Sequence, residues 1–508
     1  MKRWVLAATI LGSSMAFIDT TVVNVALPVM QRELGTSVAD AQWIIDAYLL
    51  VLSALILAGG SLGDRLGRVR MFSIGVVLFA AASIWCGFAP SPMQLIMARA
   101  VQGAGAALLV PGSLAIITAT FPKAERGRAI GTWSSLTSLA IIAGPLLGGT
   151  LVQTISWRAV FLINAPIALV VLWIIWRHMR EKDEVRSGGI DWLGTFLVTL
   201  GLGGVTFAFI EAPARGWSDH YVWIAMATGV VALIAFVFVE LHVAEPIVPF
   251  SLFRSRAFTG ANALTLLLYA ALSAATFLLP FNLIQVQGYS PASAGAAFLP
   301  FVGTMSLISR WSGALADRIG PRWLLTFGPI VTGLGFVLLA RPSLGGSYWT
   351  TFFPGILVLG LGMSFTVAPL TTTVMTSIDD EQRAGAASGI NNAVARAAGL
   401  LAIAILGAVA VSIFSRDLDA RLAGQPEAVR QAMAAQAVRL AEAAPPIGSD
   451  GVFIKDAVRH SFVRAFRVVV LISGALAMLS AIGGFLSVRR DRGAGAARNP
   501  PLSSQRSR

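Results

Sequence analysis

This chain of 508 residues is poor in charged residues, in histidine and in cysteine. Asp, Glu, Lys and Arg together make up 12%, about half of the share in soluble domains. The single cysteine, Cys86, excludes an intrachain disulfide and a metal site built from cysteines. No Gly-Lys dipeptide is present, which excludes a phosphate-binding loop of the Walker type. We therefore expect no cofactor, no metal site and no ATP hydrolysis by this chain.

Long apolar runs dominate the sequence instead. Hydrophobic residues make up 56% of the chain and recur in runs of roughly 20, each long enough to cross a bilayer. The sequence therefore predicts an all-α integral membrane protein. We predict fourteen transmembrane helices, at roughly 4–30, 43–63, 69–89, 93–119, 127–153, 157–177, 190–211, 220–240, 257–284, 293–316, 322–341, 350–376, 385–414 and 463–488.

The net charge of +13 is distributed by membrane side. Most of the 38 Lys and Arg residues fall on one face of the predicted spans, and the positive-inside rule makes that face cytoplasmic. An even number of spans places both termini there, and the arginine-rich tail agrees. This distribution predicts a multi-pass protein of the cytoplasmic (inner) membrane with both termini cytoplasmic, and it argues against a nucleic-acid partner.

A charged loop occurs twice. Gly60-Ser-Leu-Gly-Asp-Arg-Leu-Gly67 and Gly313-Ala-Leu-Ala-Asp-Arg-Ile-Gly320 each lie between two apolar runs. Two copies in one membrane chain indicate two related halves in the same orientation, with a substrate path between them. We predict that these loops hold the cytoplasmic helix ends together and release them as gates. The candidate gating residues are Gly60, Asp64, Arg65, Gly67, Arg68, Gly313, Asp317, Arg318 and Gly320.

The position of the two loops predicts the domain organisation. They lie eight spans apart, whereas two six-helix halves alone would place them six apart. Two helices are therefore inserted between the pseudo-symmetric halves. We predict a six-helix bundle at 1–180, two linker helices at 181–250, a second six-helix bundle at 251–490 and a disordered cytoplasmic tail at 491–508.

The second bundle carries a long external loop, 415–462. Within it, Pro426 precedes a short amphipathic pattern that predicts a helix, and Pro445-Pro446 ends that pattern. The loop is either a lid or partner site, or a tolerated surface insertion, and the residues leave both open.

Three ionisable residues within predicted spans are functional candidates, because a charge inside the bilayer is costly. Asp19 lies in the middle of the first span, where it suits proton coupling or binding of a cationic group; a helix–helix hydrogen bond is the alternative. Arg99 keeps its charge and needs a partner, and Asp19 and Asp46 reach a similar depth. Asp46 is close to the outer surface, so it either joins this pair in proton coupling or is solvated.

Two other features point to movement and to a substrate. Gly144, Pro145, Gly148 and Gly149 in the fifth span predict a kinked helix with a tightly packed face, which acts as a hinge or as a seal against ion leak. Arg396 lies near mid-depth in the thirteenth span after Asn391 and Asn392, where it contacts the substrate or pairs across the bundle.

These motifs resemble the major facilitator superfamily and, within it, the 14-spanner drug–proton antiporter family (EmrB/QacA type). The resemblance rests on Asp19 to Pro28, the loop Gly60 to Arg70, the Arg99-to-Gly105 stretch, the Gly144-Pro145 motif, and Trp157 to Pro166. It implies a proton gradient as the driving force, an arginine at position 99 associated with proton coupling, and a fifth-span motif typical of antiporters. The candidate substrate cavity residues are Asn24, Gln102, Asn391, Asn392 and Arg396.

The resemblance implies an exporter of amphipathic drugs or small metabolites, not an enzyme, that exchanges its cargo for protons. We expect a monomer in the lipid bilayer whose partners are protons and a small-molecule substrate. Some relatives use a periplasmic adaptor protein, and the long external loop leaves that partner open. The interiors of the tenth and thirteenth spans lack the extra carboxylates of some relatives, which argues against polyvalent cationic substrates. The alternatives are a proton-coupled importer and a non-transporting membrane receptor.

Overall fold

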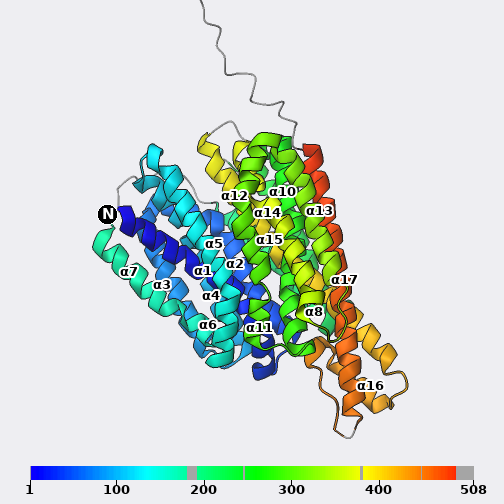
Figure 1. The fold of residues 1–508 in the computed structure, drawn as a ribbon. Coiled ribbons are helices and arrows are strands. Elements are labelled where there is room, and N and C mark those ends of the chain that lie inside the picture. The colour runs from blue at the N-terminus through cyan, green and yellow to red at the C-terminus, as the bar shows by residue number, and fades with distance from the viewer. Residues whose placement is uncertain (1, 180–190, 244–245, 378–380, 448, 488–508) are drawn as a thin grey trace, which may run out of the picture.

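The computed structural model describes residues 2–179, 191–243, 246–377, 381–447 and 449–487, and within these ranges the chain is helical with no strand. Two groups of long helices stand side by side in Figure 1. Helix α1 begins and α17 ends at the same end of the molecule, which we call the terminal end. The opposite end, where the short helix α16 projects, is called the α16 end.

The helices follow one another with short connections. The first group contains α1 (Lys2–Leu34), α2 (Val38–Leu66), α3 (Arg68–Phe88), α4 (Pro92–Thr120), α5 (Lys123–Thr154), α6 (Ala159–Leu162) and α7 (Asn164–His178). Helices α8 (Trp192–Arg215) and α9 (His220–His242) come next. The remaining elements are η1 (Phe250–Arg254), α10 (Arg256–Phe281), η2 (Asn282–Val286), α11 (Pro291–Ala296), α12 (Leu299–Ile319), α13 (Pro321–Leu339), α14 (Tyr348–Thr376), α15 (Glu381–Arg421), α16 (Glu427–Ala435), η3 (Ala437–Glu442) and α17 (Gly451–Ser487).

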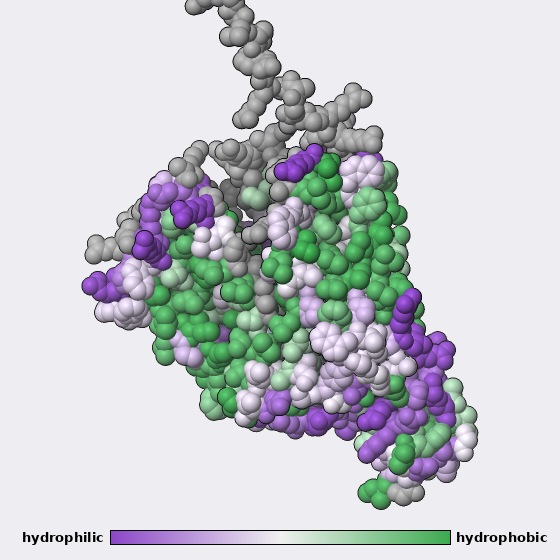
Figure 2. All heavy atoms as spheres, in the orientation of Figure 1, coloured by the Kyte–Doolittle hydropathy of each residue, from purple (hydrophilic) through white to green (hydrophobic). Residues whose placement is uncertain are grey.

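The helices have the length and surface of membrane spans. Thirteen are long and apolar enough to cross a bilayer in the described part of the chain, and the apolar Leu139–Thr154 stretch of α5 adds a fourteenth. Figure 2 shows hydrophobic residues covering the middle of the visible face, with hydrophilic residues gathered toward both ends. This band is the surface that lipid tails would cover. The prediction of an all-α membrane protein is confirmed.

The spans predicted at 157–177 and 293–316 correspond to Ala159–His178 and Pro291–Ser309, each formed by two successive helices, α6 with α7 and α11 with α12. One predicted boundary was wrong. The loop predicted at 415–462 is largely helical at its two ends, because α15 continues to Arg421 and α17 begins at Gly451. The short helix that Pro426 was predicted to start is confirmed as α16.

The two charged loops share one backbone conformation. Gly67 joins α2 to α3 with φ 101°, and Gly320 joins α12 to α13 with φ 83°. Both values lie in the region that side chains with a Cβ rarely adopt, which explains a glycine at the end of each copy. The sequence repeat is therefore also a repeat of structure.

Helices α8 and α9 pack against each other, and α8 also lies against α2 and α15. The two large groups meet where α5 packs on α11, α2 on α15 and α1 on α10. The predicted domain boundaries stay a prediction. Most of the predicted linker start at 181–190 and the predicted tail at 491–508 lie outside the described residues.

Candidate functional site

A buried ion pair lies in the middle of the first group of helices. Asp19 of α1 and Arg99 of α4 are 0% and 1% exposed, and the Arg99 Nη1 donates to Asp19 Oδ2 at 2.5 Å. Arg99 Nε also donates to the main-chain oxygen of Ile44 in α2 at 2.9 Å. The guanidinium therefore connects three helices, and the charge of each partner is balanced by the other.

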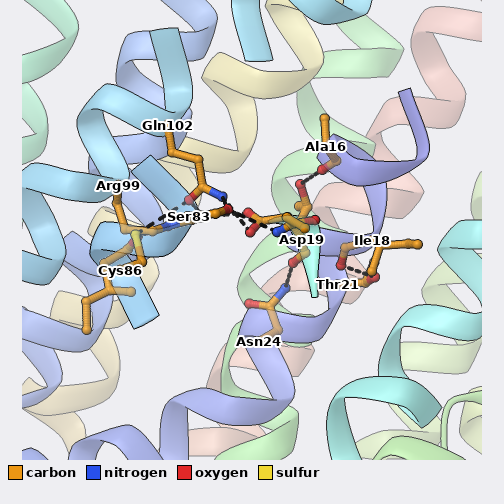
Figure 3. A network of polar contacts seen from close by, with 12 residues as sticks. Ala16, Ile18, Asp19, Thr21, Asn24, Ser83, Cys86, Arg99 and Gln102 are labelled. Atoms are coloured by element: carbon orange, nitrogen blue, oxygen red, sulfur yellow. Dashed lines mark hydrogen bonds and ion pairs between the residues drawn. The ribbon is translucent and has the colours of Figure 1, made fainter. Parts of the chain in front are cut away.

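Gln102 extends this pair into a network. Its Nε2 donates to Asp19 Oδ1 at 2.8 Å and to Ser83 Oγ at 2.6 Å, while its Oε1 accepts from Arg99 Nη1 at 2.6 Å. Asn164, the first residue of α7, donates to Ser83 at 3.0 Å. Figure 3 shows Arg99 and Gln102 converging on Asp19. Gln102 was predicted to line a substrate cavity, and it lies instead within the ion-pair network.

Two aromatic rings lie against the Arg99 guanidinium. The Arg99 guanidinium carbon lies 4.3 Å from the ring centre of Tyr48 and 5.9 Å from that of Phe161. Both aromatic residues are buried. Flat contact between a guanidinium and an aromatic ring adds attraction that water does not compete with here. Asp19 and Arg99 are therefore shielded from solvent in this conformation.

Asp46 is buried but belongs to no such network. It is 0% exposed, and neither carboxylate oxygen has a hydrogen-bond partner in the described part of the chain. Its neighbours on α2 show what covers it: the Trp43 ring lies 6.2 Å from that of Phe207 in α8, and Leu50 packs at Gly203. The alternative of a solvated Asp46 is therefore wrong, because α8 covers this face of α2.

The remaining polar candidates lie on α1 and α15. Asn24 donates to Thr20 of its own helix, and its Oδ1 is buried without a partner. Asn391 donates to Asn262 and Thr265 of α10 at 3.2 and 2.7 Å, so it ties α15 to α10.

Asn392 is exposed and bonds only within its own helix. Arg396 follows it one turn later on the same face of α15, half-buried, with its Nε buried and unpartnered. Part of the hydrogen-bonding capacity of Asn392 and Arg396 is therefore not satisfied within α15.

The charged loops are only partly described. The side chains of Asp64 and Asp317 lie outside the described residues, so their predicted gating role stays a prediction. Gly63 and Gly313 have no atom near the place a Cβ would take, and Gly60 has only an ordinary contact with Pro111. Arg68 donates to the main-chain oxygen of Ala115 in α4 at 3.4 Å. This bond ties the start of α3 to the neighbouring helix.

The glycines of the α5 motif are sites of close helix contact. A Cβ on Gly144 would overlap Thr21 Oγ1 of α1, and one on Gly148 would lie 2.9 Å from Val22 Cγ1. On the other side, a Cβ on Gly149 would overlap the Pro291 oxygen of α11.

The contact between α5 and α11 is reciprocal. A Cβ on Gly295 of α11 would overlap the Pro145 oxygen of α5. The motif therefore lies where α5 touches α1 and, across the two groups of helices, α11. This position favours the predicted role of a seal.

Polar contacts join the two groups at the α16 end. Gln42 at the start of α2 donates to the Ile403 oxygen of α15 at 2.7 Å. Gln285 of η2 donates to the Gln31 Oε1 of α1 at 3.0 Å. Each contact lies near the end of α1 or the start of α2, so the α16 end is closed in this conformation.

The segment after α15 adds to this closure. Arg32 near the end of α1 forms an ion pair with Glu442 of η3 at 3.0 Å, and Gln31 donates to the Arg439 oxygen at 3.2 Å. We call the contacts of residues 31 and 32 with residues 439 and 442 the external bridge. It connects the segment between α15 and α17 to the other group of helices.

The second group holds an apolar pocket between α10, α12, α13 and α14, lined by residues such as Leu272, Thr276, Phe301 and Phe336. It contains no charged group. Among the described residues, no cluster of His, Cys, Asp or Glu is placed to bind a metal ion. The buried charged residues of the described chain are Asp19, Asp46, Arg99, Glu240 and Asp417, and Arg396 is half-buried.

Sequence reasoning missed several members of the network. In the sequence, Ser83 and Cys86 of α3 cannot be distinguished from other small residues of an apolar span. In the structure, Ser83 accepts two hydrogen bonds, and the Cys86 Sγ donates to Gln102 at 3.7 Å. Nothing in the sequence around Tyr48, apart from its aromatic ring, indicated a contact with Arg99. A usable signal existed for Gln102, because it follows Arg99 by three residues and so shares its helix face.

Comparison with known proteins gives consistent results. The family model of the Major Facilitator Superfamily matches residues 9–403. The chain is 32% identical to the multidrug resistance protein Stp of Mycobacterium tuberculosis over 96% of this chain and 92% of the relative. It is 32% identical to the tetracenomycin C resistance and export protein of Streptomyces glaucescens over 94% and 90%.

A solved structure shares the fold. The inward-facing, unoccupied crystal structure of a bacterial homologue of the human lysosomal transporter Spinster aligns with a TM-score of 0.65 at 19% identity. The alignment covers 96% of this chain and 98% of that one. At this identity the likeness concerns the fold alone.

Proposed function

Because this chain belongs to the major facilitator superfamily, whose members are membrane transporters and not enzymes, we propose that it exports amphipathic drugs or small metabolites in exchange for protons. The names of its relatives support an export role, since they describe multidrug resistance and antibiotic export. Proton exchange rests on one observation of this chain, the buried pair of Asp19 and Arg99. Neither the names of the relatives nor this ion pair identifies the cargo.

The pair provides a switch because only one of its members changes charge. Arg99 stays charged at all physiological pH values, whereas a carboxyl group can take up and release a proton. When Asp19 is protonated, the attraction that holds α1 to α4 is weakened, and Arg99 keeps only the oxygens of Gln102 and Ile44. Proton uptake thus loosens a contact between helices, which links the proton to movement.

The orientation follows from the charge distribution. The positive-inside rule places the terminal end in the cytoplasm and the α16 end outside, in the cytoplasmic membrane. The described conformation, closed at the α16 end, is then closed to the outside. In the export cycle, cargo enters from the cytoplasm, and the outward-open state receives protons on Asp19.

Everted membrane vesicles that contain the full chain test this proposal. The vesicles are energised, and the loss of the proton gradient is followed by a pH-sensitive dye while a panel of neutral, acidic and basic amphiphiles is added. We expect some compounds to dissipate the gradient, and Asp19→Asn to abolish that response. Asp456→Asn, which makes the same chemical change at an exposed carboxylate, is the matched control.

Two results would contradict the proposal. Unchanged gradient loss in Asp19→Asn vesicles would remove Asp19 as the proton carrier. A compound that is expelled by the full chain without any proton movement would remove proton exchange, although it would leave drug export intact.

A further inference from the structure

Arg396 is a half-buried cation without a counter-charge among the described residues. Its Nε is buried without a hydrogen-bond partner, and the side chain makes no ion pair within the described part of the chain. Tyr48 and Tyr269 are the titratable groups whose charge would act on Arg396, and no described carboxylate is among them. A guanidinium cannot discharge itself, so at mid-depth in a membrane it requires an acceptor.

The surroundings place Arg396 between the two groups of helices. Gly399, three residues later on the same face of α15, packs against Ser273 of α10, and Leu49 of α2 lies 3.9 Å from the place of its Cβ. Arg396 is therefore near the junction of α2, α10 and α15. This is where a carrier of two rocking halves holds its cargo.

Helix α2 connects this position to the Asp19–Arg99 pair. The Tyr48 ring lies 4.3 Å from the Arg99 guanidinium carbon, and the next residue, Leu49, lies beside Gly399 of α15. Arg99 is neutralised by Asp19, whereas Arg396 is not neutralised by any described residue. Of these two arginines, only Arg396 lacks an anionic partner in the described part of the chain.

We propose that Arg396 binds an anionic group of the cargo, so that the transported class is amphipathic organic anions and zwitterions with a carboxylate or similar group. This inference rests on the proposed export function. The planar guanidinium offers two parallel donors, which fit the two oxygens of a carboxylate. Asn392, exposed one turn earlier on the same helix face, can donate to the remainder of the bound group.

Binding to the purified full chain in nanodiscs of phosphatidylcholine tests this without relying on proton coupling. The probes are rhodamine B, which carries a carboxylate, and its ethyl ester, which lacks the negative charge on the same ring system. We expect the wild-type chain to bind the acid more tightly than the ester. Arg396→Gln should weaken binding of the acid by about 10- to 100-fold and leave the ester unchanged.

Two further variants sharpen the result. Arg396→Lys keeps the charge but not the paired donors, so it should retain part of the preference for the acid. Arg416→Gln removes an arginine from the exposed face of the same helix and should change neither affinity. Addition of phosphatidylglycerol to the nanodiscs tests whether a lipid headgroup occupies the position instead, since it would then compete with rhodamine B.

Several outcomes overturn the proposal. These are equal binding of acid and ester by the wild-type chain, binding of neither, an equal effect of Arg396→Gln on both, and displacement of the acid by phosphatidylglycerol. None of them affects the vesicle test of proton exchange, which depends on Asp19. The failure of one proposal is therefore distinguishable from the failure of the other.

Discussion

Asp19 and Asp46 are two carboxyl groups with no solvent exposure and opposite surroundings. Asp19 accepts hydrogen bonds from Arg99 and Gln102, whereas Asp46 has no hydrogen-bond partner in the described part of the chain. Removing one member of a buried ion pair leaves the other uncompensated, while removing an unsatisfied polar group relieves a penalty. The same substitution at the two positions should therefore have effects of opposite sign.

We predict that Asp19→Leu destabilises the protein and that Asp46→Leu stabilises it. Asp19→Leu leaves the Arg99 guanidinium without its counter-charge and should lower the free energy of unfolding by about 3–5 kcal/mol. Asp46→Leu should gain about 1–3 kcal/mol, the usual cost of an unsatisfied buried polar group. Thermal unfolding of the two purified variants, compared with the unmodified chain, measures both effects. A lower unfolding temperature for Asp46→Leu would mean that this carboxyl group has a stabilising partner.

The sequence predicted the Asp19–Arg99 pair because depth along a helix can be counted from its end. It did not predict the burial of Asp46, because counting gives depth but not the helix that covers a face. The burial of Asp46 depends on the packing of Phe207 and Gly203 of α8 against the flanking residues of α2. The neutral members of the network, such as Ser83, were missed since a hydroxyl costs little in a span and gives no sequence signal.

Among the elements, α5 and α11 cross so closely that a Cβ at the crossing would overlap the opposite backbone. Gly149 meets the Pro291 oxygen and Gly295 meets the Pro145 oxygen, so neither helix has room for a side chain at the crossing. This crossing joins the two groups of helices at the α16 end. Its glycines are therefore needed for closure and not for helix formation, which they weaken.

We predict that Gly149→Ala opens the α16 end. The added methyl group must push α11 away, and overpacking of about 1–3 kcal/mol should shift the equilibrium between the closed and open states about 5- to 150-fold toward opening. Labelling of an Asn24→Cys variant in a Cys86→Ser background, by a membrane-impermeant maleimide added at that end, reports the change as a faster reaction. Gly131→Ala is the matched control, because nothing lies near its Cβ position in the same helix.

An unchanged labelling rate in Gly149→Ala would show that the crossing does not limit opening. A comparable increase in Gly131→Ala would assign the effect to helix propensity instead.

Hydropathy predicted the membrane spans, including those at 157–177 and 293–316. It did not predict that each consists of two successive helices. The apolar run at 157–177 continues through Ile163, whose backbone angles are themselves helical, so its composition gives no sign of the change from α6 to α7. The glycines of α5 were recognised as a close-packing surface, but the partner helix was not, because contacts between segments distant in sequence leave no local trace.

At the scale of the whole molecule, the external bridge joins the two groups of helices that the proposed transport cycle moves apart. Arg32 belongs to the first group of helices, whereas Glu442 belongs to a segment whose stems, α15 and α17, lie in the second. A surface ion pair of this kind contributes little stability by itself. Its significance is geometric, since opening of the α16 end lengthens the distance across it.

We predict that a covalent link across the external bridge stops transport. Arg32→Cys and Glu442→Cys are combined in the Cys86→Ser background and treated with a short bismaleimide. Substrate-induced proton movement in vesicles should fall to the background level, because the outward-open state is no longer reached. Each single-cysteine variant with the same reagent is the control. Full activity of the linked protein would mean that the segment moves together with α1.

The absence of a counter-charge for Arg396 among the described residues also affects how the membrane potential would act on transport. A cargo with one negative charge that leaves as one proton enters transfers two charges in the same direction, so 100 mV of membrane potential contributes about 4.6 kcal/mol. A cargo with one positive charge exchanged for one proton transfers none, and only the pH difference drives it. The anionic cargo proposed for Arg396 would therefore be driven out of the cell by the membrane potential as well as by the pH difference.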